Sequence, residues 1–491
     1  MGVRYEIHRG AASVSYSLAY GRVWWRWLLL CIPVAVWVTL WFVPERPPLL
    51  PALVILGAAA LALLLYRLDS TTPETLPAWL ALSIFLALYF VRLTLLLDDP
   101  VRLDQTFPEI ISSYFHTGRT DLGMAFAETM LVFVPFCLAA TATLSLLGAR
   151  QHMTFVSTRQ LGAPYLYVAY VFGVFLLMVV SGYVAYKYRI GQMGVDPGVP
   201  LPFRLKGVVF YGRTVVLPLL ILSIIYLGHA ADKRSLVLFG FGLLLLHGVS
   251  DMALRGSRSS LLLIVLLAAF LVGSGGLRLK RLTILALGVI LAIAIWLFPI
   301  VMNYRALRIV SDAGGLALFF QALESARSDV ISSLIENLAV IYYRIPGIET
   351  IWSIIGFNGE PLNYTAIQEM RTPLGVTGHL NFGVYKLSPD TLTLYAPGFV
   401  GWLFLVGGQV FLMFGGVLLG VLCVLVPRLI YQSRLHSKPI ASTFFLWLLF
   451  ISMTDATIDG NVLMLATGVV GLILVEIVLR KVSIDLRTGR G

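Results

Sequence analysis

The sequence predicts an all-α, polytopic membrane protein of about twelve transmembrane helices with one large outer loop. Two observations support this fold class. The mean hydropathy is +0.88, with 58% hydrophobic and only 12% charged residues, a composition that excludes an ordinary soluble globule. Apolar runs of about 20 residues also recur without the alternation of barrel strands, and helices satisfy their own backbone hydrogen bonds in lipid.

We expect nine spans before the large loop and three after it. The first nine lie at 23–43, 48–66, 77–97, 123–147, 164–186, 208–228, 235–253, 259–274 and 283–303. The last three lie at 395–427, 440–454 and 460–479. The first run is too long for a signal-peptide core, so we expect it to be retained. Residues 1–302 then hold nine helices, 303–394 the loop, and 395–491 three helices and a tail.

The distribution of basic residues orients the predicted bundle. Placing both termini in the cytoplasm puts most short basic loops inside, as the positive-inside rule requires. The exceptions are the segment from Lys187 to Arg213, and Arg255 and Arg258, which fall on the outer side. An anionic ligand is the simplest explanation of these exceptions, and contact with lipid headgroups or loop acids is the alternative. The net charge of +11 fits a partner that is membrane lipid, not nucleic acid.

The outer loop divides into two halves. From Gly314 to Tyr343 apolar residues recur at helical spacing, which predicts an amphipathic helix that either lies on the membrane surface or has a binding role. From Arg344 to Tyr395 the chain is rich in Gly, Pro and Asn and has no helical period, so we expect an irregular but ordered lid or Ω-type loop over the bundle.

The run from Asp251 to Ser260 is the leading candidate site. Arg255 and Arg258 stand beside the start of the eighth span, where a helix N-terminus and guanidinium groups together favour a phosphate or pyrophosphate. The alternative is that they only snorkel to headgroups. His247, Asp251 and Arg255 are spaced four residues apart, so they share one helix face. Asp251 either holds Arg255 in place or belongs to a structural polar seam.

Three short motifs carry a resemblance to a known family. They are Arg255-Gly256-Ser257-Arg258-Ser259 at the start of a span, His379-Leu380-Asn381-Phe382-Gly383 after a large loop, and the run from Ala396 to Gly408. This pattern resembles the Wzy-type O-antigen and exopolysaccharide repeat-unit polymerases, with the O-antigen ligases as wider relatives.

The resemblance implies a membrane glycosyltransferase of GT-C-like architecture in a bacterial inner membrane, with a periplasmic active site. It implies transfer of a growing glycan from undecaprenyl pyrophosphate onto a lipid-linked repeat unit, with a separate chain-length-regulating co-polymerase as a partner. No cofactor or metal is expected. The implied pyrophosphate-binding residues are Arg255, Arg258, Arg305, Arg344 and Arg371, supported by Asp251 and His247. For activation of the acceptor hydroxyl we expect His379, with Asp390 and Glu336 as rivals.

Other functions stay open at this point. An O-antigen ligase or another lipid-dependent glycosyltransferase would use the same chemistry. A transporter of lipid-linked oligosaccharides would show related halves and charges at mid-membrane, whereas the charges here cluster at the outer end. The sequence contains no Walker loop and no HExxH run, the usual signs of ATP-driven transport and of a zinc site. Glu128, inside the fourth span, is expected to face a cavity and to pair with an outer arginine.

Overall fold

A computed structural model describes most of the chain from residue 74 onward. The described residues are 74–93, 96, 107, 109–147, 159–161, 164–191, 205–255, 259–277, 281–310, 315–325, 345–371, 375–388, 395–454 and 458–485. Six of their helices are long and apolar enough to cross a membrane, and four shorter helices are also apolar. This is the make-up of a polytopic membrane protein. The expected spans 23–43 and 48–66 lie outside the described residues, and the ten others fall on helices.

The apolar helices follow the order of the expected spans. They are α3 (Leu76–Phe85) continued by the π-helix η1 (Leu86–Val91), α6 (Arg119–Leu147), α7 (Pro164–Lys187), α8 (Leu205–Tyr211) continued by the π-helix η4 (Gly212–Val216) and α9 (Leu217–Ala230), α10 (Arg234–Arg255), α11 (Ser259–Gly273), α12 (Arg281–Val310), α18 (Gly398–Gln432), α19 (Lys438–Thr454) and α20 (Ile458–Val482). Shorter elements join them. These are α5 (Glu109–Thr117), α13 (Gly315–Ser325), α15 (Ile348–Gly356), η5 (Asn363–Thr365), α16 (Ala366–Glu369), α17 (Gly375–Gly378), the π-helix η6 (His379–Val384) and the strands β1 (Arg159–Leu161) and β2 (Ser483–Asp485).

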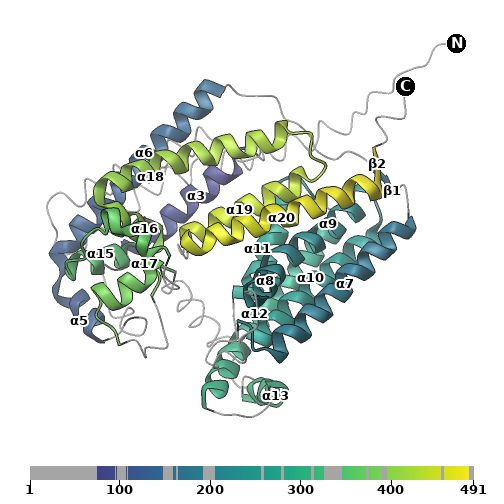
Figure 1. Cartoon of the computed structure of the whole chain (residues 1–491), viewed down its shortest axis with the longest axis horizontal. Helices are drawn as coiled ribbons and strands as arrows, with labels where there is room; N and C mark the ends of the chain where they lie inside the picture. Colours follow the sequence, from purple (N-terminus) through teal and green to yellow (C-terminus); the bar gives the residue numbers. More distant parts are fainter. Residues whose placement is uncertain are drawn as a thin grey trace.

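The helices pack around two hydrophobic cores, which we call the first and second lobes. The first lobe is built from α3, η1, α5, α6, α15, α16, α17, η6 and α18, and the second from α7 to α13 with α20. Helix α19 belongs to both, since Leu449 and Met453 pack in the first core and Phe444 and Trp447 in the second. Figure 1 shows α19 and α20 running between the two lobes.

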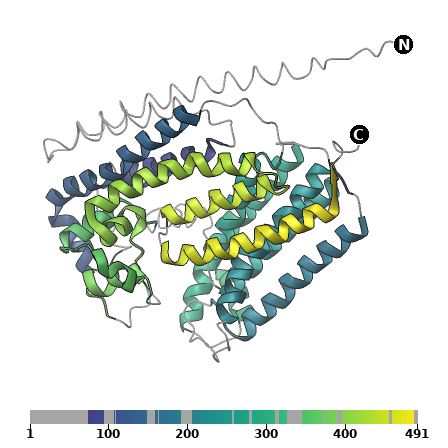
Figure 2. The same cartoon turned by 45° about the horizontal axis from the view of Figure 1, so that its top comes forward.

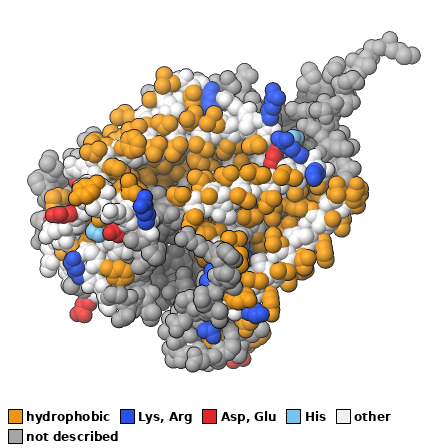
Figure 3. All heavy atoms as spheres, viewed as in Figure 1, with side chains coloured by type: hydrophobic (Ala, Val, Ile, Leu, Met, Phe, Trp, Pro, Cys, Tyr) orange, Lys and Arg blue, Asp and Glu red, His pale blue; other side chains and the backbone are white. Residues whose placement is uncertain are grey.

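The lipid-facing surface is clearest on α7. Phe172 and Val179 on this helix are exposed, as lipid contact allows in a membrane helix. Exposed tyrosines, Tyr165 and Tyr186, stand near its two ends. They are separated by about 30 Å of helix, close to the thickness of a hydrocarbon core with aromatic belts at both interfaces. Figure 3 shows hydrophobic side chains spread widely over the described helices on the side of the molecule seen in Figure 1.

Strands β1 and β2 place two distant segments at one end of the bundle. They pair antiparallel, with Arg159 opposite Asp485, so the connection after α6 and the end of α20 lie together. The sequence predicts both segments on the cytoplasmic side. Helices α13 and α15 to α17 lie away from this pair, as Figures 1 and 2 show.

The tightest helix pair in the first lobe depends on glycine. Gly416 and Gly420 of α18, four residues apart, face the backbone of α6, an arrangement that lets two membrane helices approach closely. A Cβ atom added at Gly420 would lie 2.5 Å from the carbonyl oxygen of Phe136.

We therefore expect Gly420→Ala to lower the free energy of unfolding by about 1–3 kcal/mol, because backbone must shift to admit the methyl group. Thermal unfolding of the detergent-solubilised protein measures this. Gly242→Ala on α10 is the matched control, since its Cβ would meet nothing within 4 Å. Equal melting temperatures for the two variants would contradict the close contact between α6 and α18.

The structure describes parts of both halves of the outer loop, and it corrects the expectation for the second half. In the first half, α13 covers part of the expected helix 314–343, and the residues from 326 to 343 lie outside the described part. Leu318 and Ala322 of α13 are buried in the second core, so one face of α13 packs against the bundle. The expectation of an irregular second half is wrong, because α15 and the short helices α16, α17 and η6 occupy it. Ile348, Ile351 and Trp352 are buried at helical spacing in α15. The Gly and Pro residues on either side make this helical spacing hard to recognise in the sequence.

Helix α18 is interrupted near its start. Gly407 and Gly408 have non-helical backbone angles, and the φ of +62° at Gly408 favours glycine. The break leaves the carbonyl of Leu405 free to accept a hydrogen bond from the Leu362 backbone N–H at 2.6 Å. Next to it, Gln409 Nε2 donates to Glu128 Oε1 at 2.7 Å. The sequence predicts that Glu128 pairs with an outer arginine. In the part of the chain that the structure describes, it instead accepts this hydrogen bond from Gln409.

Candidate functional site

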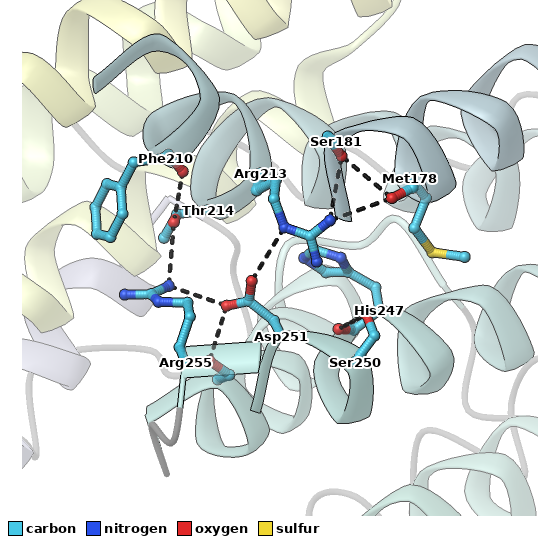
Figure 4. Close-up of polar contacts among 10 residues, drawn as sticks. Met178, Ser181, Phe210, Arg213, Thr214, His247, Ser250, Asp251 and Arg255 are labelled. Atoms are coloured by element: carbon cyan, nitrogen blue, oxygen red, sulfur yellow. Dashed lines mark hydrogen bonds and ion pairs between the residues drawn. The ribbon is translucent and has the colours of Figure 1, made fainter. Parts of the chain in front are cut away.

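A buried polar cluster of the second lobe lies where η4 meets the end of α10. Arg213 comes from η4, Asp251 and Arg255 from α10, and Ser260 from the first turn of α11. Figure 4 shows Arg213 and Arg255 pointing toward Asp251 from two sides. We call these four residues the Asp251 cluster.

Asp251 is bonded through both of its carboxylate oxygens. Oδ2 accepts hydrogen bonds from Arg255 Nη1 and Ser260 Oγ, each at 2.9 Å. Oδ1 accepts one from Arg213 Nε at 3.3 Å. The side chain of Asp251 is only 5% exposed. The expected contact between Asp251 and Arg255 along one helix face is therefore present, together with a second arginine on the opposite oxygen.

Arg213 is the deeper of the two arginines. Its side chain is 3% exposed, and its Nη1 donates to the Met178 carbonyl and the Ser181 hydroxyl, both at 3.2 Å. Gly182 makes room for it, since a Cβ there would lie 3.0 Å from Nη1. Its Nη2 is buried and has no hydrogen-bond partner among the described residues. The guanidinium is thus fixed between α7 and α10.

Arg255 lies nearer the surface. Its side chain is 15% exposed, and its Nη1 also donates to Thr214 Oγ1 at 3.3 Å. Its guanidinium stands 4.5 Å from the centre of the Phe210 ring, a cation–π arrangement. Its Nε is buried and unpaired within the part of the chain that the structure describes. The 15% of this side chain that is exposed, and not its buried Nε, is the part that a ligand could reach.

The π-helical turn η4 explains how Phe210, Arg213 and Thr214 reach α10 together. The Leu217 N–H bonds the Gly212 carbonyl, five residues back instead of four. Pro218 follows directly and has no N–H to offer the Thr214 carbonyl, which weakens the α-helical pattern at this point. Single π-turns inside helices are frequent at functional sites. The backbone of Arg213 also bonds His247 from α10.

The charges of the Asp251 cluster do not cancel. Two guanidinium groups share one carboxylate, so the cluster carries a net charge of about +1, because arginine stays protonated throughout. An anion with several oxygens could form charge-assisted hydrogen bonds with the partly exposed guanidinium of Arg255. The described residues contain no group of His, Cys, Asp and Glu able to hold a metal ion. The arrangement suits binding of a phosphate-type anion.

The structure describes only some of the residues that the sequence assigns to the site. Arg258, Glu336, Arg344 and Asp390 lie outside the described residues, and the side chain of Arg305, in α12, is also not described. Arg371 follows α16 in the first lobe and is exposed. The grouping of these arginines around one pyrophosphate therefore stays a prediction.

His379 begins η6 in the first lobe and is half-buried. Burial lowers the pKa of His379 below its ordinary value of 6.5, the nearby Glu369 acts in the opposite direction, and Lys386 lowers it further. The imidazole ring of His379 packs closely against Gly383, because a Cβ atom added at Gly383 would lie 2.9 Å from His379 Nδ1. Among the described residues His379 has no hydrogen bond or ion pair to the Asp251 cluster, and Figures 1 and 2 show α17 and α10 in different lobes.

Sequence reasoning missed two charged groups. Arg213 was noted only as one of several outer basic residues. The second is a fully buried ion pair, in which Arg92 Nη1 lies 2.5 Å from Glu349 Oε1, both side chains being 0% exposed. The Gly347 N–H also donates to Glu349 Oε1 at 3.0 Å, and burial raises the pKa of Glu349. A signal was present, because Arg92 is the one charged residue in the expected span 77–97 and such residues need a partner.

No protein-family model, no curated protein and no solved structure matches this chain.

Proposed function

We propose that this protein is a membrane glycosyltransferase that polymerises lipid-linked oligosaccharide repeat units. One observation supports this proposal most: the Asp251 cluster holds an excess guanidinium charge at the end of α10, in a protein made of apolar helices. A substrate that is both lipid-anchored and strongly anionic fits such a position. A polyprenyl diphosphate carrying a glycan has both properties.

The proposed reaction needs stabilisation of a leaving group. A hydroxyl of the incoming repeat unit attacks the anomeric carbon of the growing glycan, and the bond from that carbon to the diphosphate oxygen breaks. The electron pair of that bond leaves with the diphosphate, and the hydroxyl proton goes to a base. Arg255 would contact the diphosphate oxygens as negative charge grows on them, the kind of electrostatic assistance that often contributes most to rate. No metal or nucleotide sugar takes part.

His379 is the proposed base. A half-buried imidazole whose pKa is lowered by burial is neutral at pH 7 and can accept the hydroxyl proton. Because the histidine belongs to the first lobe and Arg255 to the second, the acceptor would bind from one lobe and the donor from the other. The O-antigen ligases, the wider relatives that the sequence resembles, use a loop histidine in a comparable setting. The resemblance implies a site on the periplasmic face of a bacterial inner membrane.

One observation favours a transporter of lipid-linked oligosaccharides as a second candidate. Transporters often bind substrate at interrupted membrane helices, and α18 is interrupted at Gly407 and Gly408. The carbonyl of Leu405 at this break is already bonded by the Leu362 N–H. A chain segment, and not a substrate, thus occupies that hydrogen-bonding position, so we favour the enzyme.

Incubation of the purified protein with a lipid-linked repeat unit, followed by a glycan ladder gel, tests the proposed function. We expect a ladder of products, each one repeat longer than the last. Absence of any ladder, with movement of the same lipid across vesicle membranes, would show a transporter instead.

The pH dependence of polymerisation tests His379. The neutral imidazole is the active form, so the rate should fall as pH drops through the pKa of His379, with a midpoint below 6.5. His379→Ala should lower the rate and remove this acidic limb. Polymer of normal length and an unchanged pH profile in His379→Ala would exclude the histidine from the mechanism.

A further inference from the structure

We infer that Arg213 is a positioning residue that sets the charge of the anion site: it neutralises Asp251 and so leaves the charge of Arg255 for a bound diphosphate. This inference rests on the proposed function, because it concerns the same site. It assigns to Arg213 a role different from that of Arg255, although both arginines bond the same carboxylate.

The two arginines differ in access. Arg213 is 3% exposed, and its bonds to Asp251, the Met178 carbonyl and Ser181 fix the guanidinium inside the bundle. Arg255 is 15% exposed and stands against the Phe210 ring. An arriving anion therefore meets Arg255 first, while Arg213 acts on it through Asp251.

Arg213 affects anion binding through the net charge of the three groups Arg213, Asp251 and Arg255. The contact between Arg255 and Asp251 at 2.9 Å would by itself be a neutral ion pair with little attraction for an anion. Arg213 adds a positive charge on the other carboxylate oxygen, so the three groups together keep a charge of about +1. In a site of low dielectric this one charge decides whether an anion is attracted.

The geometry also explains the choice of arginine over lysine. The planar guanidinium bonds the Asp251 carboxylate through Nε while Nη1 reaches two acceptors on α7. A lysine ammonium supplies the same charge from a single point. Lysine at this position should therefore preserve the charge balance and lose part of the fixed orientation.

Binding of inorganic pyrophosphate and of undecaprenyl pyrophosphate to the purified full-length protein tests the inference, and the two probes separate a free anion from a lipid headgroup. We expect Arg213→Met to weaken binding of both by about tenfold or more. Restoring the balance by a second change, Arg213→Met with Asp251→Asn, should return the affinity to within about threefold of the native value, because Arg255 then keeps an uncompensated charge. Arg213→Lys should also stay within about threefold.

Arg234→Met is the matched control, because this exposed arginine stands at the opposite end of the same helix. It should bind both probes as the native protein does. Native affinity in Arg213→Met, or a double variant no better than Arg213→Met, overturns the inference. If Arg213→Met does not fold, Arg213→Lys decides: a loss of affinity there of tenfold or more shows that charge is not what Arg213 supplies.

The outcomes also separate this inference from the proposed function. Pyrophosphate binding that follows the charge pattern, in a protein that makes no glycan ladder, supports the role of Arg213 and rejects the polymerase. A ladder made by a protein whose binding does not depend on Arg213 rejects the role of Arg213 alone. In the polymerisation assay, Arg213→Met should raise KM for the lipid donor, and the double variant should restore it.

Discussion

Arg255→Ala is expected to reduce polymer formation about 100-fold or more, which is the usual cost of removing one charged donor from a transition state. The substitution removes the guanidinium that has an unpaired Nε and stands beside Phe210. It also leaves Asp251 with Arg213 as its single charged partner, so the cluster becomes neutral. The rate of glycan ladder formation by purified protein measures the effect.

Arg234→Ala provides the control for that prediction, since it removes the same charge from the same helix far from the cluster. It should polymerise normally. The sequence also singles out Arg258, and Arg258→Ala should abolish long polymer while the protein stays in the membrane. Full-length chains made by Arg255→Ala would remove this arginine from the mechanism.

Arg92→Met is expected to destabilise the protein by about 3–5 kcal/mol, because it leaves the Glu349 carboxylate buried without its counter-charge. Glu349 lies in α15 and Arg92 at the end of η1, so the pair fixes the loop to the membrane helices. Thermal unfolding in detergent and limited proteolysis measure the loss. Tyr385, at the end of the helix η6 that His379 begins, bonds Ser353 of α15, so a displaced α15 should also shift His379.

Glu360→Gln, an exposed change on the same loop, should leave the melting temperature unchanged. The double variant Arg92→Met with Glu349→Met removes both charges and should be more stable than Arg92→Met alone. A melting temperature of Arg92→Met equal to that of the native protein would contradict a structural role for the pair.

Helix positions were predictable because membrane spans are defined by long apolar runs, a signal that needs no tertiary information. The pair of Asp251 and Arg255 was predictable for a similar reason, since four-residue spacing places both on one helix face. Arg213 could not be paired in the same way. Its contact with Asp251 joins residues 38 positions apart and depends on the π-helical turn η4.

The outer loop contains a helix that the sequence did not predict. Gly, Pro and Asn around Ile348 to Gly356 indicate irregular chain, yet burial of Ile351 and Trp352 stabilises a short helix there. Tertiary packing, not local propensity, decides such segments. Likewise, the break at Gly407 and Gly408 is stabilised by the bond from Leu362, a residue of the distant loop. The apolar run that contains the break predicts one continuous span.

The central claim is that the Arg255 end of α10 faces the outside of the inner membrane and binds a lipid diphosphate there. Labelling of Ser257→Cys with a membrane-impermeant thiol reagent tests it most directly, in a chain whose cysteines at 31, 137 and 423 are replaced. We expect labelling from outside intact cells once the outer membrane is opened, and slower labelling when undecaprenyl pyrophosphate is added to the purified protein. Labelling only after the inner membrane is broken, or a rate that the lipid diphosphate does not change, would contradict this account.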